Sequence, residues 1–181
     1  MTFSSNTTPV HTERAVAKAA RSLDALSNLD ATELGALYRS ASTPRIIDLE
    51  GDLEGRMLVS PRGGDRLAEA MRRLARWRHF PWRGKSFRPR DEQHGEGCNR
   101  VFTDRNRWFR FETTLGRSRA GDFDALLLDY DLPENPFLVR KIKDEIRQLE
   151  PGLFLGQAYV VSRDRPTLAL YFALRDHAPQ Y

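Results

Sequence analysis

Cysteine and long apolar runs are what this 181-residue chain has least of. Its single cysteine, Cys98, excludes an internal disulfide framework and any zinc site that takes two thiolates from this chain. No stretch approaches the roughly 18 apolar residues of a membrane-spanning helix. Residues 1–11 are too polar for the core of a secretory signal peptide. These absences predict a cytoplasmic protein that does not insert into a membrane.

Lysine is scarce as well, since 4 of the 29 basic residues are lysines and the rest are arginines. This bias is typical of GC-rich bacterial genomes. The net charge is +4, and nine of the basic residues fall within residues 66–90, which hold one acid. Aromatic residues alternate with these arginines, a pattern that can stack bases and hold phosphates. Nucleic-acid or phosphate-surface binding through this stretch is therefore the alternative function. A solvated helix followed by an inward-packing strand explains the same residues, and no RNA-binding signature accompanies them.

Helical spacing is concentrated in the first quarter of the chain. The sequence divides into a flexible tail (1–11), an N-terminal helical segment (12–45) and a β-barrel-like domain (46–177). Within the helical segment, Asp30 and Glu33 have the spacing of a capping box that begins a second helix. Two further helices are predicted near residues 65–79 and 136–149, the later one beginning at Asn135-Pro136.

Short segments of alternating apolar and polar residues fill the rest of the chain. The predicted strands are residues 53–60, 82–87, 97–103, 107–115, 123–131, 153–162 and 166–175. Their connections are too short for parallel crossovers, which indicates an antiparallel meander. Several strands, such as the one through Ala125-Leu126-Leu127-Leu128, are apolar on both faces, so both faces must be covered. We therefore predict an α+β fold: a curved antiparallel sheet or small β-barrel of about 7–8 strands, with N-terminal helices and one late helix.

The order of these elements over residues 47–175 resembles that of calycin or lipocalin-like proteins. A helical preface precedes a first strand through Leu53-Glu54-Gly55-Arg56-Met57, a meander, a late helix and a closing pair of strands. The Gly-x-Trp signature of lipocalins is absent, and Trp82-Arg83-Gly84 on a later strand is its nearest match. The resemblance implies a cup for a small, mostly apolar ligand. Some barrels of this kind also catalyse isomerase or cyclase reactions, and fold alone does not choose between these roles.

Polar side chains within otherwise apolar strands mark the candidate site. Strand parity places Asp129 and Asp131 on one face about 7 Å apart, and such a carboxylate pair can divide into an acid and a base. Capping of the turn that follows is their alternative role. Parity also groups Arg110 with Trp108 and Glu112, either inside a barrel or on a solvated outer face.

An apolar cup needs a few convergent polar groups to orient its ligand, and these strands supply them. The predicted ligand-binding residues are Trp108, Arg110, Glu112, Tyr130, Gln157 and Tyr159, and the predicted catalytic residues are Asp129 and Asp131. In this hypothesis Arg110 meets an anionic group of the ligand, and one of the two aspartates accepts a proton in any reaction. Gln157 and Tyr159 supply directional hydrogen bonds.

No metal or cofactor is predicted. His94, Glu96 and Cys98 alternate, but the chain has none of the usual histidine or cysteine ligand spacings, so a flexible loop is the preferred interpretation. The predicted function is binding of a small, largely apolar or amphipathic molecule that can be anionic. Cofactor-independent isomerase, cyclase or lyase chemistry is an open extension, and a docking role of the N-terminal helices is a further alternative. The sequence predicts neither the ligand nor the oligomeric state.

Overall fold

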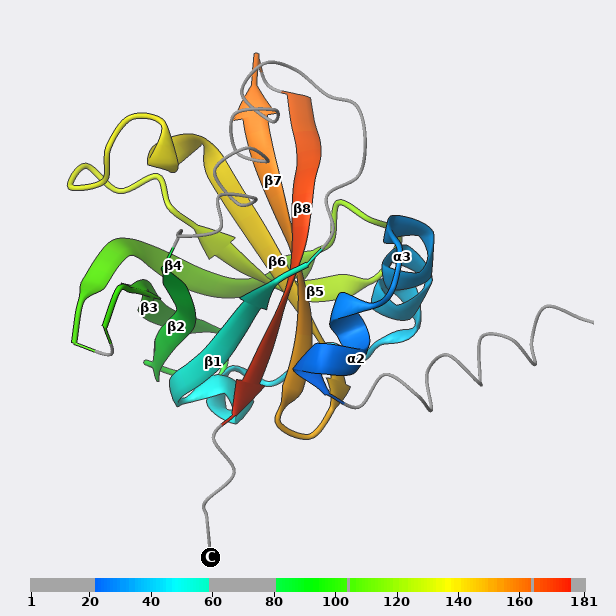
Figure 1. Cartoon of the computed structure of the whole chain (residues 1–181). Coiled ribbons are helices and arrows are strands. Elements are labelled where there is room, and N and C mark those ends of the chain that lie inside the picture. The colour runs from blue at the N-terminus through cyan, green and yellow to red at the C-terminus, as the bar shows by residue number, and fades with distance from the viewer. Residues whose placement is uncertain (1–21, 59–80, 104, 164, 177–181) are drawn as a thin grey trace, which may run out of the picture.

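The computed structural model describes residues 22–58, 81–103, 105–163 and 165–176 (Figure 1). Its strands form a closed antiparallel barrel in which each strand pairs with the next one along the chain and the last pairs with the first. They are β1 (Gly51–Met57), β2 (Trp82–Pro89), β3 (His94–Val101), β4 (Arg107–Arg117), β5 (Asp124–Asp129), β6 (Ile142–Glu150), β7 (Leu153–Ser162) and β8 (Arg165–Asp176). The predicted small antiparallel barrel with N-terminal helices is confirmed.

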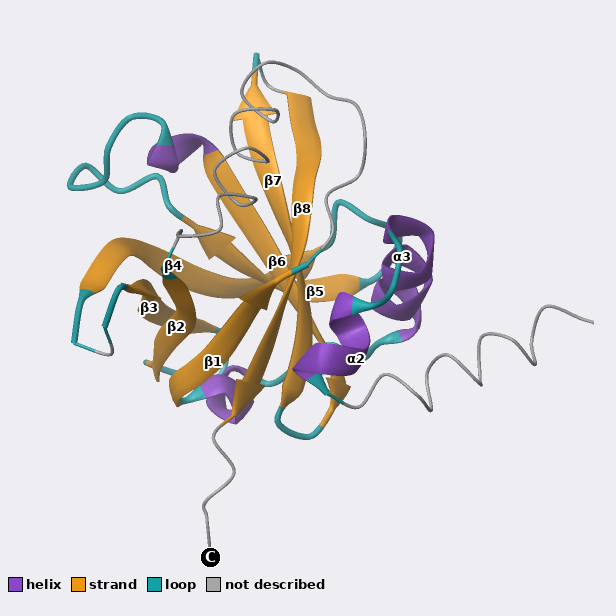
Figure 2. Cartoon of the chain, viewed as in Figure 1, coloured by secondary structure: helices purple, strands orange, loops and turns teal. Residues whose placement is uncertain are grey.

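Two short helices of the described residues precede the barrel and lie against one side of it (Figure 2). They are α2 (Leu23–Ser27) and α3 (Ala31–Ser40), and two 3-10 turns follow later, η1 (Ile46–Leu49) and η2 (Val139–Lys141). The capping box predicted at Asp30 and Glu33 begins α3, with both reciprocal hydrogen bonds present. The helices bury their leucines against the outer face of β7 and β8, where Leu155 and Tyr171 lie. The apolar runs on both faces of these strands are thereby covered on the outside by helices.

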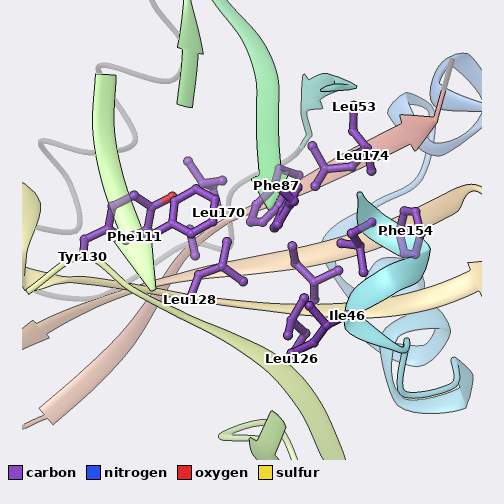
Figure 3. Close-up of a cluster of buried hydrophobic side chains, with 14 residues drawn as sticks. Ile46, Leu53, Phe87, Phe111, Leu126, Leu128, Tyr130, Phe154, Leu170 and Leu174 are labelled. Atoms are coloured by element: carbon purple, nitrogen blue, oxygen red, sulfur yellow. The ribbon is translucent and has the colours of Figure 1, made fainter. Parts of the chain in front are cut away.

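The barrel has two different ends, named here after the 3-10 turns beside them. At the η1 end, Ile46 and Leu49 of η1 pack into the interior core and close it. At the η2 end lie the β3–β4 hairpin, the β7–β8 hairpin and the long β5–β6 connection over residues 130–141. Figure 3 shows Ile46 at one side of the interior core and Phe111 with Tyr130 at the other. The interior of the barrel is therefore filled by apolar side chains at the η1 end.

The predicted late helix over residues 136–149 is wrong. Its first residues form only the short turn η2, and Ile142–Glu150 is strand β6, paired with β5 on one side and β7 on the other. Ile142 and Ile146 are four residues apart, a spacing that keeps two side chains on one face in a helix and in a strand alike. Pairing with two neighbouring strands decides between the two.

Two smaller expectations also change. The segment around His94, expected to be a flexible loop, begins strand β3. Pro151-Gly152, expected to end a helix, is the turn between β6 and β7, where Gly152 has a φ of 75°. The predicted tail (1–11), the helix near 65–79 and most of the helix over 12–27 lie outside the described residues. Among the residues that are described, no helix has the length and apolar character needed to cross a membrane.

Candidate functional site

A cluster of four polar side chains lies inside the barrel near the η2 end. Lys85 projects inward from β2, Asn99 from β3 and Asp144 from β6, while Tyr130 follows the end of β5. All four are buried. Lys85 Nζ lies 2.8 Å from Asp144 Oδ2, 2.5 Å from Tyr130 Oη and 3.0 Å from Asn99 Oδ1. Strands distant in sequence thus bring an ion pair, a phenol and an amide into direct contact.

Aromatic rings surround the ammonium group of Lys85. The ring centroids of Phe172, Tyr130, Phe111 and Trp82 lie 5.0, 5.2, 5.3 and 5.6 Å from Nζ, within the range of cation–π attraction. The Trp82 indole N–H also donates to Asn99 Oδ1 at 2.9 Å. The cluster is therefore a charged centre enclosed by apolar walls.

Glycines on neighbouring strands allow three of these rings to come so close. A Cβ atom added at Gly55 would overlap the Trp82 ring, one at Gly97 the Phe111 ring, and one at Gly156 the Phe172 ring. A glycine inside a strand often marks such a close approach. Each of these three rings around Lys85 therefore packs directly over a glycine of the neighbouring strand.

Burial shifts the proton affinities of the cluster. Removal of water lowers the pKa of Lys85, and the Asp144 carboxylate beside it opposes that shift. Burial and the same carboxylate raise the pKa of Tyr130 well above its usual value. Tyr130 is therefore a neutral phenol that donates to Asp144 Oδ2 at 3.0 Å.

One acceptor of the cluster is unmatched. Asp144 Oδ1 is buried, and no donor in the described part of the chain reaches it. A second buried acid, Glu145, provides the contrast on the outer face beneath α3. Its carboxylate accepts hydrogen bonds from Tyr38, Ser118 and Arg119, so both of its oxygens are used. Glu145 joins α3 to the barrel, whereas Asp144 retains an oxygen for a further partner.

Inward-facing apolar residues between the cluster and the η2 end are only half-buried. Trp82, Phe109, Val139 and Ile142 pack against the interior core while remaining partly exposed. Their exposure differs from that of the fully buried side chains near η1, such as Phe154. The η2 end is thus lined by apolar groups that lead toward the polar cluster.

Most of the residues predicted for the site lie on the outer face of the barrel. Phe111 and Leu128 fill the interior, so their neighbours Arg110, Glu112 and Asp129 point outward and are exposed. Glu112 and Asp129 are direct cross-strand partners, whereas Asp131 lies beyond the end of β5. The face they share is the outer one, so the structure does not bring them together inside the barrel.

Ion pairs and a turn account for the polar partners of these residues. Arg110 lies 3.2 Å from Glu96. Asp129 pairs with Lys143 and accepts the backbone N–H of Asp131 at 2.8 Å, which is the turn-capping role considered above. Asp131 pairs with Arg140 at 2.6 Å, an interaction that keeps the pKa of Asp131 below its usual value. The catalytic role of this carboxylate pair stays a prediction, and it would have to be exercised on the outer surface.

The remaining predicted residues are divided between two places. Trp108 is 46% exposed at the start of β4, where its ring contacts Phe102. Gln157 and Tyr159 are buried on the outer face of β7, and the Tyr159 hydroxyl donates to Gln157 Oε1 at 2.7 Å. Of the predicted residues, Tyr130 alone belongs to the interior cluster.

Sequence reasoning missed Lys85, Asn99 and Asp144. The helix predicted over residues 136–149 gave no reason to expect Asp144 in the interior. In strand β6, Ile142, Asp144 and Ile146 occupy one face, but a charged residue between two isoleucines does not give the apolar–polar alternation from which a strand is predicted.

No metal site is found in the described part of the chain, where no three histidine, cysteine or acidic side chains are grouped closely enough to hold an ion. The residues considered for one are otherwise engaged: His94 contacts Asp91, and Glu96 pairs with Arg90 and Arg110.

Comparison with known proteins gives the fold and no activity. The sequence matches no protein-family model and no curated protein. Among solved structures, the chain is similar to a protein from Thermomonospora curvata, with a TM-score of 0.53 and 19% sequence identity. The similarity covers 93% of this chain and 99% of that one. The eight-stranded closed barrel is consistent with the calycin-like architecture that the element order indicated.

Proposed function

We propose that the barrel binds a small, largely apolar molecule through its η2 end, with the polar group of that molecule placed at the cluster of Lys85, Asp144, Tyr130 and Asn99. The observation that carries this proposal is the buried Lys85–Asp144 pair with one unmatched carboxylate oxygen. A buried ion pair costs desolvation free energy that an apolar pair would not. An unmatched buried acceptor adds to that cost. Such a cost is typical of functional sites.

The apolar lining supports the same proposal. Ligand sites are mostly apolar with a few convergent polar groups, and the inward-facing residues toward the η2 end fit this description. Trp82 and Phe109 are half-buried there, so a ligand can cover surface that water now reaches. Burial of that surface would supply the driving force for binding.

If the barrel also catalyses a reaction on the bound molecule, the cluster limits which residue can act as the proton acceptor. An isomerase, cyclase or lyase reaction needs a proton acceptor beside the ligand. Asp129 and Asp131 are exposed on the outside, so inside the barrel Asp144 is the carboxylate placed for this role, with the Tyr130 phenol as a neighbouring donor.

The alternative function, nucleic-acid binding through residues 66–90, receives no support from its described part. Within β2, Lys85 and Phe87 face the interior, and only the arginines of this strand are exposed. An inward-facing ring cannot stack on a base. Residues 66–80 lie outside the described residues.

Binding can be tested with a pair of tryptophan substitutions in the β5–β6 connection. Val139 is half-buried and packs against the interior core, whereas Phe137 is 68% exposed. Nile red, a neutral apolar dye, is the probe, and native mass spectrometry of the freshly purified protein would detect a co-purified apolar molecule. We expect Val139→Trp to weaken Nile red binding at least tenfold and Phe137→Trp to leave it unchanged. Absence of saturable dye binding and of any co-purified molecule would refute the proposal.

A further inference from the structure

The interior cluster uses every N–H and O–H group that it owns. The three N–H groups of Lys85 match three acceptors within 3.0 Å: Asp144 Oδ2, Tyr130 Oη and Asn99 Oδ1. Tyr130 donates its proton to Asp144 Oδ2. The amide of Asn99 donates to Tyr130 Oη at 3.2 Å and to the Phe109 carbonyl at 3.3 Å. A ligand that needs a donor would find none unoccupied among these side chains.

The acceptors are not all used in the same way. Asn99 Oδ1 accepts from Lys85 and from the Trp82 indole. Asp144 Oδ2 accepts from Lys85 and from Tyr130, while Oδ1 of the same carboxylate has no donor in the described chain. The cluster therefore has one acceptor without a donor, Asp144 Oδ1, and a ligand that fits it must bring one hydrogen-bond donor.

Charge balance narrows the nature of that donor. The Lys85 ammonium and the Asp144 carboxylate neutralise each other, and the side chains of the interior core around them are apolar or, for Tyr130, neutral. A ligand carboxylate would lie beside Asp144 without a cation to compensate it. A ligand ammonium would add a second positive charge next to Lys85. In surroundings of low dielectric constant either charge is costly, so an uncharged donor is the best match.

We propose that the molecule bound in the barrel is uncharged and largely apolar, and that it donates one hydrogen bond to Asp144 Oδ1 from a hydroxyl or N–H group. This inference rests on the proposed function and names its ligand class. The rings of Trp82, Phe111 and Phe172 around the cluster favour a flat aromatic ligand such as a phenol. The inference differs from the anionic ligand that the sequence suggested for Arg110, which points outward.

Access requires a local movement, because Asp144 Oδ1 is fully buried. The half-buried rings of Trp82 and Phe109 lie on the η2 side of the interior. Displacement of these rings would bring the ligand donor and Oδ1 together. The Lys85–Asp144 contact through Oδ2 does not need to break.

Three naphthalene derivatives of similar size separate the possible polar groups. 2-Naphthol carries a neutral donor, 2-methoxynaphthalene carries the same oxygen without a proton, and 2-naphthoate carries an anion. Each would be titrated against the full-length protein at pH 7, both directly by calorimetry and by displacement of Nile red. We expect 2-naphthol to bind about tenfold or more tightly than either of the other two, since a hydrogen bond to a charged acceptor is worth that much.

Variants then assign the preference to Asp144. Because Asp144→Asn can fail to fold, the double variant Lys85→Met/Asp144→Leu, which leaves no buried charge, is made alongside it. In the double variant the advantage of 2-naphthol over its methyl ether should fall below about threefold. Asp124, an exposed aspartate at the start of β5, provides the control, and Asp124→Asn should keep the full preference.

The outcomes distinguish this inference from the function beneath it. Saturable Nile red binding with equal affinities for 2-naphthol and its methyl ether would overturn the inference and leave the proposed function standing. In that case a water molecule is the partner of Oδ1. Tightest binding of 2-naphthoate would overturn the inference as well. Failure of Nile red and of all three compounds to bind would overturn the proposed function itself.

Discussion

Substitution of Lys85 by methionine is expected to destabilise the protein severely, although methionine matches lysine in length and is apolar. The ammonium group donates to Asp144, Tyr130 and Asn99 at 2.8, 2.5 and 3.0 Å. Without it, Asp144 Oδ2 retains only the Tyr130 hydroxyl and Oδ1 still has no donor. Loss of one member of a buried ion pair costs about 3–5 kcal/mol, a large share of the roughly 5–15 kcal/mol that stabilises a domain.

The measurement is urea denaturation at pH 7, monitored by circular dichroism. An unchanged slope of the unfolding free energy against urea concentration checks that the variants still unfold in two states. Lys143→Met is the matched control. Lys143 lies next to Asp144 in β6 but on the outer face of the barrel, where it pairs with the exposed Asp129 of β5. An exposed pair contributes about 0–1 kcal/mol. The double variant Lys85→Met/Asp144→Leu should recover most of the loss, since it leaves no lone charge in the core.

Two results would refute this reasoning. A loss below about 1 kcal/mol for Lys85→Met would mean that Asp144 reaches water or another donor when the lysine is gone. A double variant as unstable as the single one would mean that the loss comes from packing rather than from an uncompensated carboxylate.

Three further predictions concern stability and binding. Burial raises the pKa values of Tyr38 and Tyr130, so both contribute stability that is fully present below the unfolded-state pKa near 10. Above pH 10, each tyrosine should lower the free energy of unfolding by about 1.4 kcal/mol per pH unit, measured by urea denaturation from pH 9 to 11. The pKa of Lys85 is lowered, so Lys85 has the opposite effect: it should make stability rise with pH between its folded-state pKa and its unfolded-state pKa near 10.5. Gly156→Ala should cost about 1–3 kcal/mol in thermal melts through overlap with the Phe172 ring, while at Gly116 a methyl group meets only a flexible leucine and should be tolerated. Filter binding with random nucleic acid should show only generic, steeply salt-dependent association, and tight binding at 0.2 M salt would revive the alternative function.

The strands with one clear apolar face were predictable because their two faces meet different surroundings. In β4, Phe109, Phe111 and Leu115 face the core while Arg110 and Glu112 face solvent, which is the alternation a half-buried strand requires. The closed barrel followed from strands that are apolar on both faces and from connections too short for crossovers. Closure itself depends on the pairing of β1 with β8, a contact between the two ends of the barrel sequence that local patterns do not encode.

Strand β6 could not be recognised in the same way because it buries polar residues on both faces. Asp144 faces the interior, whereas Glu145 and Arg147 are buried outside, beneath the N-terminal segment. With charges at buried positions, the period of two disappears, and the remaining isoleucines at i and i+4 imitate a helix. The partners that make these burials possible, such as Tyr38 and Ser118, are far away in the sequence.

The buried polar residues of β6 concealed the site in the sequence, and the same residues identify it in the structure. A polar residue at an interior position breaks the pattern from which strands are predicted, and it survives in a fold only if distant strands satisfy it. Glu145 is satisfied completely, so its burial is explained by the attachment of α3. Asp144 is satisfied at one oxygen only, and the fold gives no structural reason for the second. That difference between two neighbouring acids of one strand is why the search for a ligand should begin with an uncharged hydrogen-bond donor at Asp144.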